Sequence, residues 1–145
     1  MSRVRKLLSV PDTNNRVAAA LLILRVVFGF AMANHGWGKI RNPLHWLDGA
    51  PNPPPGILQA AAAVSEFFGG LAIAFGLLSP AAALGIAATL SYAIYTHKMK
   101  GDTFAGAKGG GSYELAALHL TAVLTVLVGG PGRYSLDAIL FGKRR

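Results

Sequence analysis

The stretch ILQAAAAVSEFFGGLAIAFGLL, residues 57–78, decides the fold class of this chain. It is long enough to cross the hydrocarbon core of a bilayer as one helix, which takes about 20 residues. One acidic residue, Glu66, lies near its middle. A charge at that depth is costly unless it is paired or protonated, so an acid inside a membrane indicates a functional site.

The composition agrees with a membrane protein. Charged residues make up 14% of the 145 residues and hydrophobic residues 52%, whereas soluble domains carry about 25% charged residues. The chain has no cysteine, which excludes disulfides, thiol redox chemistry and cysteine-ligated Fe–S or zinc sites. We expect a single domain, residues 1–145, embedded in the membrane.

Four apolar stretches are expected to cross the bilayer as helices, at about residues 17–37, 57–78, 81–97 and 113–130. They are rich in glycine and alanine, as close helix packing in lipid favours. Ser79 is expected to cap the third helix, and Ser135 to cap a short helix that ends at Phe141 and lies on the membrane surface. The predicted fold is an all-α membrane protein, a four-transmembrane-helix bundle with a short C-terminal interfacial helix.

A secretory signal peptide is the alternative for the first apolar stretch. Ala31-Met32-Ala33 resembles a cleavage site. Arg25 interrupts the apolar region, however, so we interpret this stretch as a transmembrane helix.

The formal charge of +8 is distributed as membrane topology requires, and not as a nucleic-acid surface. Four crossings place both termini on one side. The basic residues of that side are Arg3, Arg5, Lys6, Arg16, Arg133, Lys143, Arg144 and Arg145, and those of the opposite loops are Lys39, Arg41, Lys98, Lys100 and Lys108. The positive-inside rule therefore predicts a multi-pass protein of the cell (inner) membrane with both termini in the cytoplasm.

The helical faces indicate which polar residues point into the bundle. In the stretch quoted above, small residues share the face of Glu66, and bulky residues occupy the opposite face. In the first helix Arg25 shares a face with Gly29, Ala33 and Lys39. Small residues mark helix contacts and bulky ones face lipid, so we expect both charges inside the protein.

Depth then predicts the pairing. Arg25 lies about 12 Å from the inner end of its helix and Glu66 about 13 Å from the outer end of its own, at 1.5 Å per residue. Both are therefore near the middle of the membrane, and we predict an Arg25–Glu66 ion pair. His119 is expected on the outer side of this pair, with Tyr92 near the same level. The alternative is a pair that only fixes the helix register.

The chain resembles the DoxX family of small four-helix membrane proteins. The residues that carry the resemblance are Arg25, Gly29, His35-Gly36, Lys39, Glu66, Gly70, Gly76-Leu77-Leu78, Tyr113-Glu114 and, most specifically, GPGRYSLD at residues 130–137. The resemblance implies a redox-linked membrane protein. Its relatives include the DoxD subunit of thiosulfate:quinone oxidoreductase, members linked to quinone or catechol resistance, and members of a membrane complex with superoxide dismutase and a sulfurtransferase.

We therefore expect a quinone-interacting subunit of a membrane redox complex. Quinone carbonyls accept hydrogen bonds and quinone reduction takes up two protons, so a site needs donors and an acid. The predicted catalytic residues are Glu66, Arg25 and His119, the predicted cofactor-binding residues are Tyr92, His35 and Lys39, and no metal site is expected. Since the chain has no Rossmann glycine motif, no cysteine cluster and too few glutamates for a di-iron bundle, electrons must come from a partner subunit or a diffusible reductant.

Two other functions stay open from the sequence. The chain is alternatively a non-enzymatic membrane anchor or assembly partner of a larger complex, because lipid packing alone accounts for most of its residues. A third hypothesis is a haem protein that uses two of His35, His97 and His119 as ligands.

Overall fold

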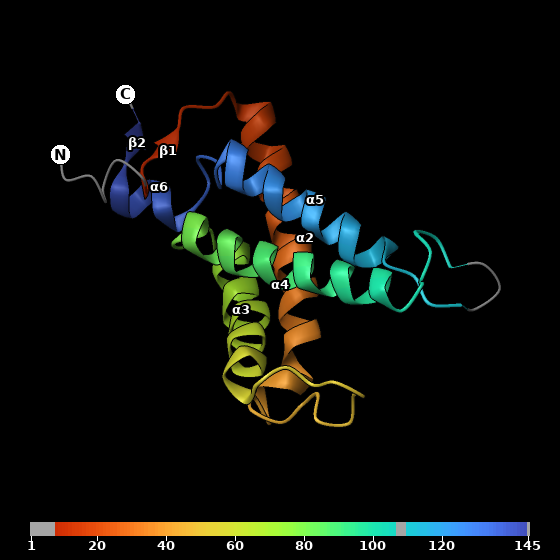
Figure 1. The fold of residues 1–145 in the computed structure, drawn as a ribbon. Helices are drawn as coiled ribbons and strands as arrows, with labels where there is room; N and C mark the ends of the chain where they lie inside the picture. Colours follow the sequence, from red (N-terminus) through yellow and green to blue (C-terminus); the bar gives the residue numbers. More distant parts are fainter. Residues whose placement is uncertain (1–7, 107–109, 145) are drawn as a thin grey trace.

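The computed structural model describes residues 8–106 and 110–144, and this part of the chain is all-helical apart from one small strand pair. The elements, labelled as in Figure 1, are β1 (Val10–Pro11), α2 (Asn15–Ile40), α3 (Gly56–Phe75), α4 (Ser79–Met99), α5 (Glu114–Gly129), α6 (Leu136–Phe141) and β2 (Lys143–Arg144). The four long helices correspond to the four predicted apolar stretches, and α6 to the predicted short helix.

Local signals in the sequence account for several helix ends. The Asn14 side chain accepts a hydrogen bond from the amide of Val17 and caps α2. Gly76 ends α3 in the left-handed conformation, with φ of 66°, which glycine adopts without steric cost. Ser135 caps α6, as expected, by accepting a hydrogen bond from the Ala138 amide. Ser79 does not cap α4; it is the first residue of that helix.

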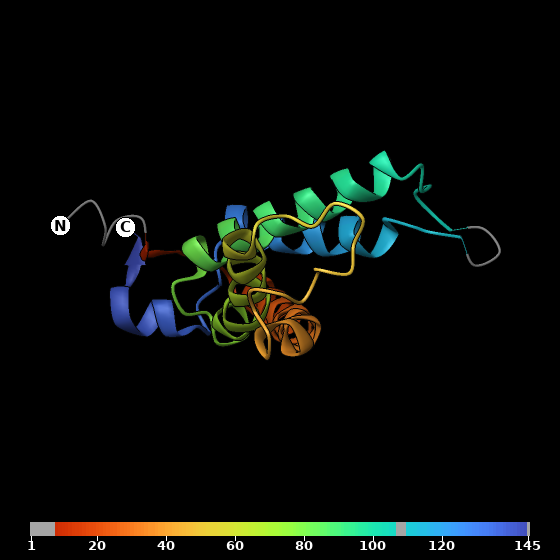
Figure 2. The ribbon, with the colours of Figure 1, turned by 60° about the horizontal axis from the view of Figure 1, so that its bottom comes forward.

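The long helices form two antiparallel pairs that cross steeply. α2 packs along α3, and α4 packs along α5 across that first pair (Figures 1 and 2). The four long helices are therefore arranged as two crossed pairs. The two pairs meet through larger side chains, including Phe28, Ile73, Ile86 and Val123, which form the core. Glycines instead bring α2 and α3 into close contact along much of their length.

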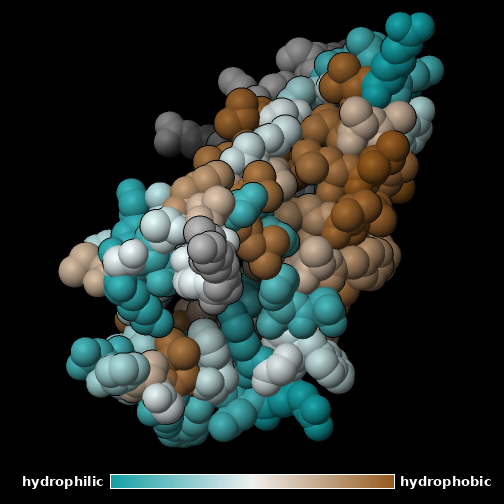
Figure 3. All heavy atoms as spheres, turned by 90° about the vertical axis from the view of Figure 1, so that its right-hand side faces the viewer, coloured by the Kyte–Doolittle hydropathy of each residue, from teal (hydrophilic) through white to brown (hydrophobic). Residues whose placement is uncertain are grey.

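Every long helix also has an exposed apolar side. Examples are Ile23, Val27, Ile57, Phe68, Leu84, Tyr95, Leu118 and Val128. Hydrophobic side chains gather over a broad region of the face shown in Figure 3, with hydrophilic ones below it. Of the described helices, α2 and α3 are long and apolar enough to cross a membrane, judged by length and composition, and α5 is apolar but shorter.

The segments near the two termini lie together. β1 and β2 pair in parallel, and the amide of Val10 donates a hydrogen bond of 3.0 Å to the carbonyl of Gly142. β1 and β2 therefore lie at the same end of the molecule, beside α6 (Figure 1).

Candidate functional site

The contact between α2 and α3 is a close approach of two backbones. A Cβ on Gly36 would collide with the backbone of Phe67, and one on Gly29 would collide with the facing turn of α3. These contacts fix the register, because Gly36 faces the middle of α3 whereas the Arg25 guanidinium lies beside Gly76 at its end. Gly36 and Arg25 are separated by about 16 Å along α2, at 1.5 Å per residue.

Glu66 is buried, as its helical face predicted, with 5% of its surface exposed. Its Oε1 accepts a hydrogen bond of 2.6 Å from the Lys39 ammonium, which forms an ion pair across the α2–α3 contact. Its Oε2 is buried and has no hydrogen-bond partner in the described part of the chain. The Trp46 ring covers Lys39, with 4.4 Å from Nζ to the ring centroid, in a cation–π contact. A cation, a buried acceptor atom and an aromatic ring therefore meet at one place.

The loop that carries Trp46 is held by the side chain of Gln59, which is 2% exposed. This amide accepts a hydrogen bond from the Leu47 amide (2.8 Å) and donates to Asp48 (2.9 Å) and to the Pro54 carbonyl (3.0 Å). The Trp46 indole donates to the Gln59 carbonyl at 2.9 Å. Gln59 therefore fixes the loop against the first turns of α3 and places Trp46 over the ion pair.

Asp48 makes this loop contact sensitive to acid. The hydrogen bond from Gln59, and then that from His45, holds the pKa of the Asp48 carboxyl below its usual value. Because the folded pKa lies below the unfolded one, the contact stabilises the loop above the ordinary aspartate pKa of about 3.9. That stabilisation is lost as the pH falls through the folded pKa.

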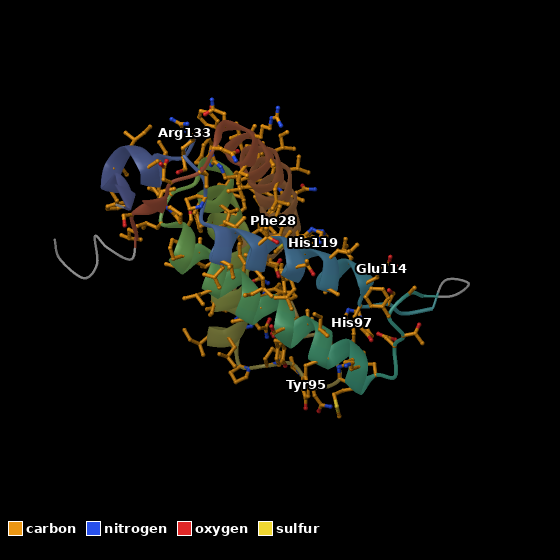
Figure 4. The ribbon with its side chains drawn as sticks, turned by 90° about the horizontal axis from the view of Figure 1, so that it is seen from above. Phe28, Tyr95, His97, Glu114, His119 and Arg133 are labelled. Carbon is orange, nitrogen blue, oxygen red and sulfur yellow. The ribbon has the colours of Figure 1, made fainter. Side chains whose placement is uncertain are left out.

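His119 of α5 lies against α2. Its ring centroid is 5.6 Å from that of His35 and 5.7 Å from that of Phe28, and Figure 4 shows Phe28 and His119 together. His119 Nδ1 is 2.8 Å from the Leu115 carbonyl oxygen. A carbonyl only accepts hydrogen bonds, so Nδ1 carries the hydrogen and Nε2 is left as an acceptor in the neutral ring.

Four of the predicted site residues thus form a row in space, from α5 across α2 to α3. His35 and Lys39 are one helical turn apart, where Cβ atoms are about 5–6 Å from each other. His35 contacts His119 on one side, and Lys39 pairs with Glu66 on the other. We call these four residues, His119, His35, Lys39 and Glu66, the polar track.

Arg25 does not belong to the polar track, and the predicted Arg25–Glu66 ion pair is wrong. Arg25 is buried, with 2% of its surface exposed. Its Nη1 donates a hydrogen bond of 2.8 Å to the Ala74 carbonyl, and its Nη2 donates to the Tyr134 carbonyl. The error lies in the register: the first turns of α3 extend past the end of α2 and pack on the Gln59-held loop, so the two helices are not aligned end to end.

Asp137 is the polar residue that the sequence-based prediction missed. It is fully buried, and its carboxylate accepts hydrogen bonds from the amides of Leu78 (2.7 Å) and Ser79 (2.8 Å). Its own amide donates to the Gly76 carbonyl at 2.8 Å. Asp137 therefore performs across the fold the capping of α4 that we expected from the Ser79 side chain.

Arg25 and Asp137 together stabilise the α3–α4 turn. Arg25 binds one of the last carbonyls of α3, at the negative end of that helix dipole, and Asp137 binds the first amides of α4, at the positive end of its dipole. Each charge therefore stabilises the helix end that it faces. Burial of the Arg25 guanidinium disfavours its charge, and the Asp137 carboxylate offsets part of this cost. Tyr134 and Asp137 belong to the string GPGRYSLD, which stands out in the sequence only through the family resemblance. We call Arg25, Tyr134 and Asp137 with the α3–α4 turn the clasp.

Tyr92 also lies outside the polar track, which corrects its predicted place. It is 48% exposed and its ring neighbours that of Tyr95 on the outer side of α4. Small residues on the same face suggested an inward position, but the α4 face that packs on the core carries Ala83, Ile86 and Leu90.

Of the histidines considered for haem, His35 and His119 are neighbours.

The third of these histidines, His97, lies near the C-terminal end of α4. Its Nδ1 is 2.7 Å from a carboxylate oxygen of Asp102. Figure 4 shows His97 away from the Phe28–His119 contact. The structure therefore brings two of the three candidate haem ligands together and places His97 in a separate pair.

No curated protein and no solved structure matches the chain. A DoxX family model matches residues 20–99, which include Arg25, Lys39, Glu66 and most of the helical core. This match covers more than half of the 145 residues, and the chain is therefore a membrane protein that belongs to the DoxX family.

Proposed function

We propose that this protein is a quinone-interacting subunit of a membrane redox system, and that the polar track binds the quinone headgroup. The observation that carries the proposal is the hydrogen bonding of the two carboxylate oxygens of Glu66. One carboxylate oxygen is paired with the Lys39 ammonium, and the other is buried without a hydrogen-bond partner in the described residues. A buried acid with an unsatisfied oxygen is a candidate for proton exchange with a ligand.

The chemistry of the polar track suits a quinone. The Lys39 ammonium is a donor for a headgroup carbonyl, and Glu66 beside it holds or releases a proton at its unpaired oxygen. Nε2 of His119 is an acceptor that becomes a donor when the ring is protonated. The Trp46 ring offers an aromatic surface for the headgroup, and the exposed apolar helix sides suit an isoprenoid tail.

The electrons in this proposal come from outside the chain. Quinone reduction takes two electrons and two protons, and the polar track is suited to bind the headgroup and to move protons. A partner subunit or a diffusible reductant would supply the electrons, as expected from the absence of cysteine and of a dinucleotide-binding motif.

The topology is part of the same proposal. We place both termini in the cytoplasm of a cell with an inner membrane, with α2, α3, α4 and α5 as the crossings. The β1–β2 pairing supports termini on one side of the membrane. α4 begins at Ser79, next to the end of α3, and Gly130, which follows α5, lies beside Pro11. The α4–α5 pair therefore begins and ends at the end of the molecule that holds β1.

Glu66→Gln is the variant that tests the proposed function. It keeps the shape of the side chain but removes the charge and the proton-accepting oxygen. We expect a short-chain quinone analogue to raise the Tm of the wild-type protein in mild detergent, and Glu66→Gln to weaken analogue binding at least 10-fold, measured by quenching of tryptophan fluorescence. Glu114→Gln, at the exposed start of α5, is the matched control and should bind like the wild type.

Equal binding by Glu66→Gln and the wild type would remove the proposed site. If the wild type itself binds no quinone analogue, the second candidate function is preferred. This is a non-enzymatic anchor or assembly partner, favoured by the exposed apolar sides of α4 and α5. In that case partner subunits should co-purify with the wild type and with Glu66→Gln alike.

A further inference from the structure

α6 turns its apolar side outward. Ile139 is 77% exposed, Leu140 58% and Leu136 38%, whereas Asp137 on the opposite side is fully buried. This short helix leaves three large apolar side chains exposed, although burying apolar surface lowers the free energy by about 25 cal/mol per Å². Burial of this exposed side in an apolar environment outside the chain would therefore be favourable.

The clasp fixes α6 in this orientation. The Asp137 carboxylate binds the amides of Leu78 and Ser79, and its amide binds the Gly76 carbonyl. Rotating α6 to bury Ile139 would break these buried hydrogen bonds. The outward position of the apolar side is thus built into the fold.

Basic residues flank α6 in the sequence. Arg133 lies three residues before α6, and Lys143 and Arg144 follow it after Gly142. Arg133 donates a hydrogen bond of 2.5 Å to the neutral side-chain amide of Asn15, and Arg16, which follows Asn15 in the sequence, is exposed.

The acids of this end of the molecule are few. Asp137 is buried and held by backbone amides, and Asp12 is exposed. Among the side chains that the structure describes here, Arg16 and Arg133 outnumber the exposed acid Asp12, and the sequence adds Lys143 and Arg144. The net charge of this end of the molecule is therefore positive.

We propose that the α6 face, made of Leu136, Ile139, Leu140 and the preceding Arg133, docks into the membrane surface and recognises anionic lipid headgroups. An apolar side bordered by basic residues inserts at the boundary between headgroups and acyl chains, and the basic residues attract anionic phosphates. The charge of the border selects an anionic leaflet over a zwitterionic one. This inference rests on the membrane location of the family and is independent of the quinone proposal.

The full chain in nanodiscs tests the depth of the α6 face. Because the natural chain has no cysteine, Ile139→Cys carries a single polarity-sensitive bimane label. We expect lipid-attached quenchers to reach this label and aqueous iodide to be excluded from it, relative to the same label at Asn52→Cys in the exposed part of the α2–α3 loop. Equal iodide quenching at both positions would overturn the proposal and would indicate that this face binds a protein partner instead.

Lipid composition tests the charge selection. The Tm of the wild-type protein should be higher by several degrees in nanodiscs with 30% phosphatidylglycerol than in pure phosphatidylcholine, and 0.5 M salt should remove most of this difference by screening. The triple variant Arg133→Gln, Lys143→Gln and Arg144→Gln should lose the difference. The variant Lys98→Gln with Lys100→Gln, at the other end of α4, should keep it. No dependence on phosphatidylglycerol, or the same loss in both variants, would contradict recognition by the α6 face.

Discussion

Replacing Asp137 with alanine is expected to lower the free energy of unfolding by about 3–5 kcal/mol, the usual cost of removing one partner from a buried charged network. The carboxylate satisfies the amides of Leu78 and Ser79 and compensates the buried Arg25 cation. Alanine leaves both amides without a partner and the guanidinium without a counter-charge. Thermal and denaturant unfolding in detergent, followed by circular dichroism, measures the effect.

The control for this prediction is Glu114→Ala. Glu114 is an exposed carboxylate at the start of α5, where removal of a charge should change stability by no more than about 0.5 kcal/mol. If Asp137→Ala unfolds within about 1 kcal/mol of the wild type, the clasp does not hold the α3–α4 turn as described.

The second large effect is expected for Gly70→Leu. A Cβ at this position would meet the backbones of Gly29 and Ala33 across the α2–α3 contact, so the larger side chain forces the two helices apart. Overpacking costs about 1–3 kcal/mol where side chains can adjust, and backbone atoms have less freedom to do so. We expect a loss at the upper end of that range or beyond, together with weakened pairing of Lys39 with Glu66.

Gly38→Ala provides the comparison within α2. A Cβ on Gly38 meets no atom within 4 Å, and alanine favours a helix interior over glycine by up to about 1 kcal/mol. This variant should be as stable as the wild type or slightly more so. A tolerated Gly70→Leu would show that α2 and α3 are not in backbone contact there.

The sequence was sufficient to predict the helices and the burial of Glu66. The length of each apolar stretch indicated the four long helices, and the small residues around Glu66 and Gly70 indicated the side of α3 that packs inward. Each of these features depends only on the residues of a single helix and on its helical period. A single stretch of sequence is therefore enough to predict it.

The partners of the charged residues could not be obtained in this way. Arg25 and Glu66 each lie on the expected face, but their pairing depends on the register of two helices, which the Gln59-held loop shifts. The contact of His35 with His119 depends on the steep crossing of α5 over α2. Such relations arise from tertiary packing, and no period within one helix encodes them.

The clasp shows the same limit in another form. GPGRYSLD was conspicuous as a string, yet nothing local indicates that its last residue caps a helix that begins 58 residues earlier in the chain. A buried aspartate in a short terminal helix reads from sequence as an exposed first-turn acid. Its role follows from the return of the C-terminal segment to the α3–α4 turn.

A double-mutant cycle on Lys39 and Glu66 tests the central claim most directly, namely that Lys39 compensates the buried carboxylate of Glu66. The stabilities of Lys39→Met, Glu66→Gln and the double variant are compared with that of the wild type by denaturant unfolding in detergent. We predict a coupling free energy of about 1–3 kcal/mol. Lys39→Met leaves the buried Glu66 carboxylate unpaired, Glu66→Gln leaves the partly exposed Lys39 ammonium unpaired, and the double variant leaves neither. Single-variant costs that simply add would contradict the ion pair and with it the proposed site.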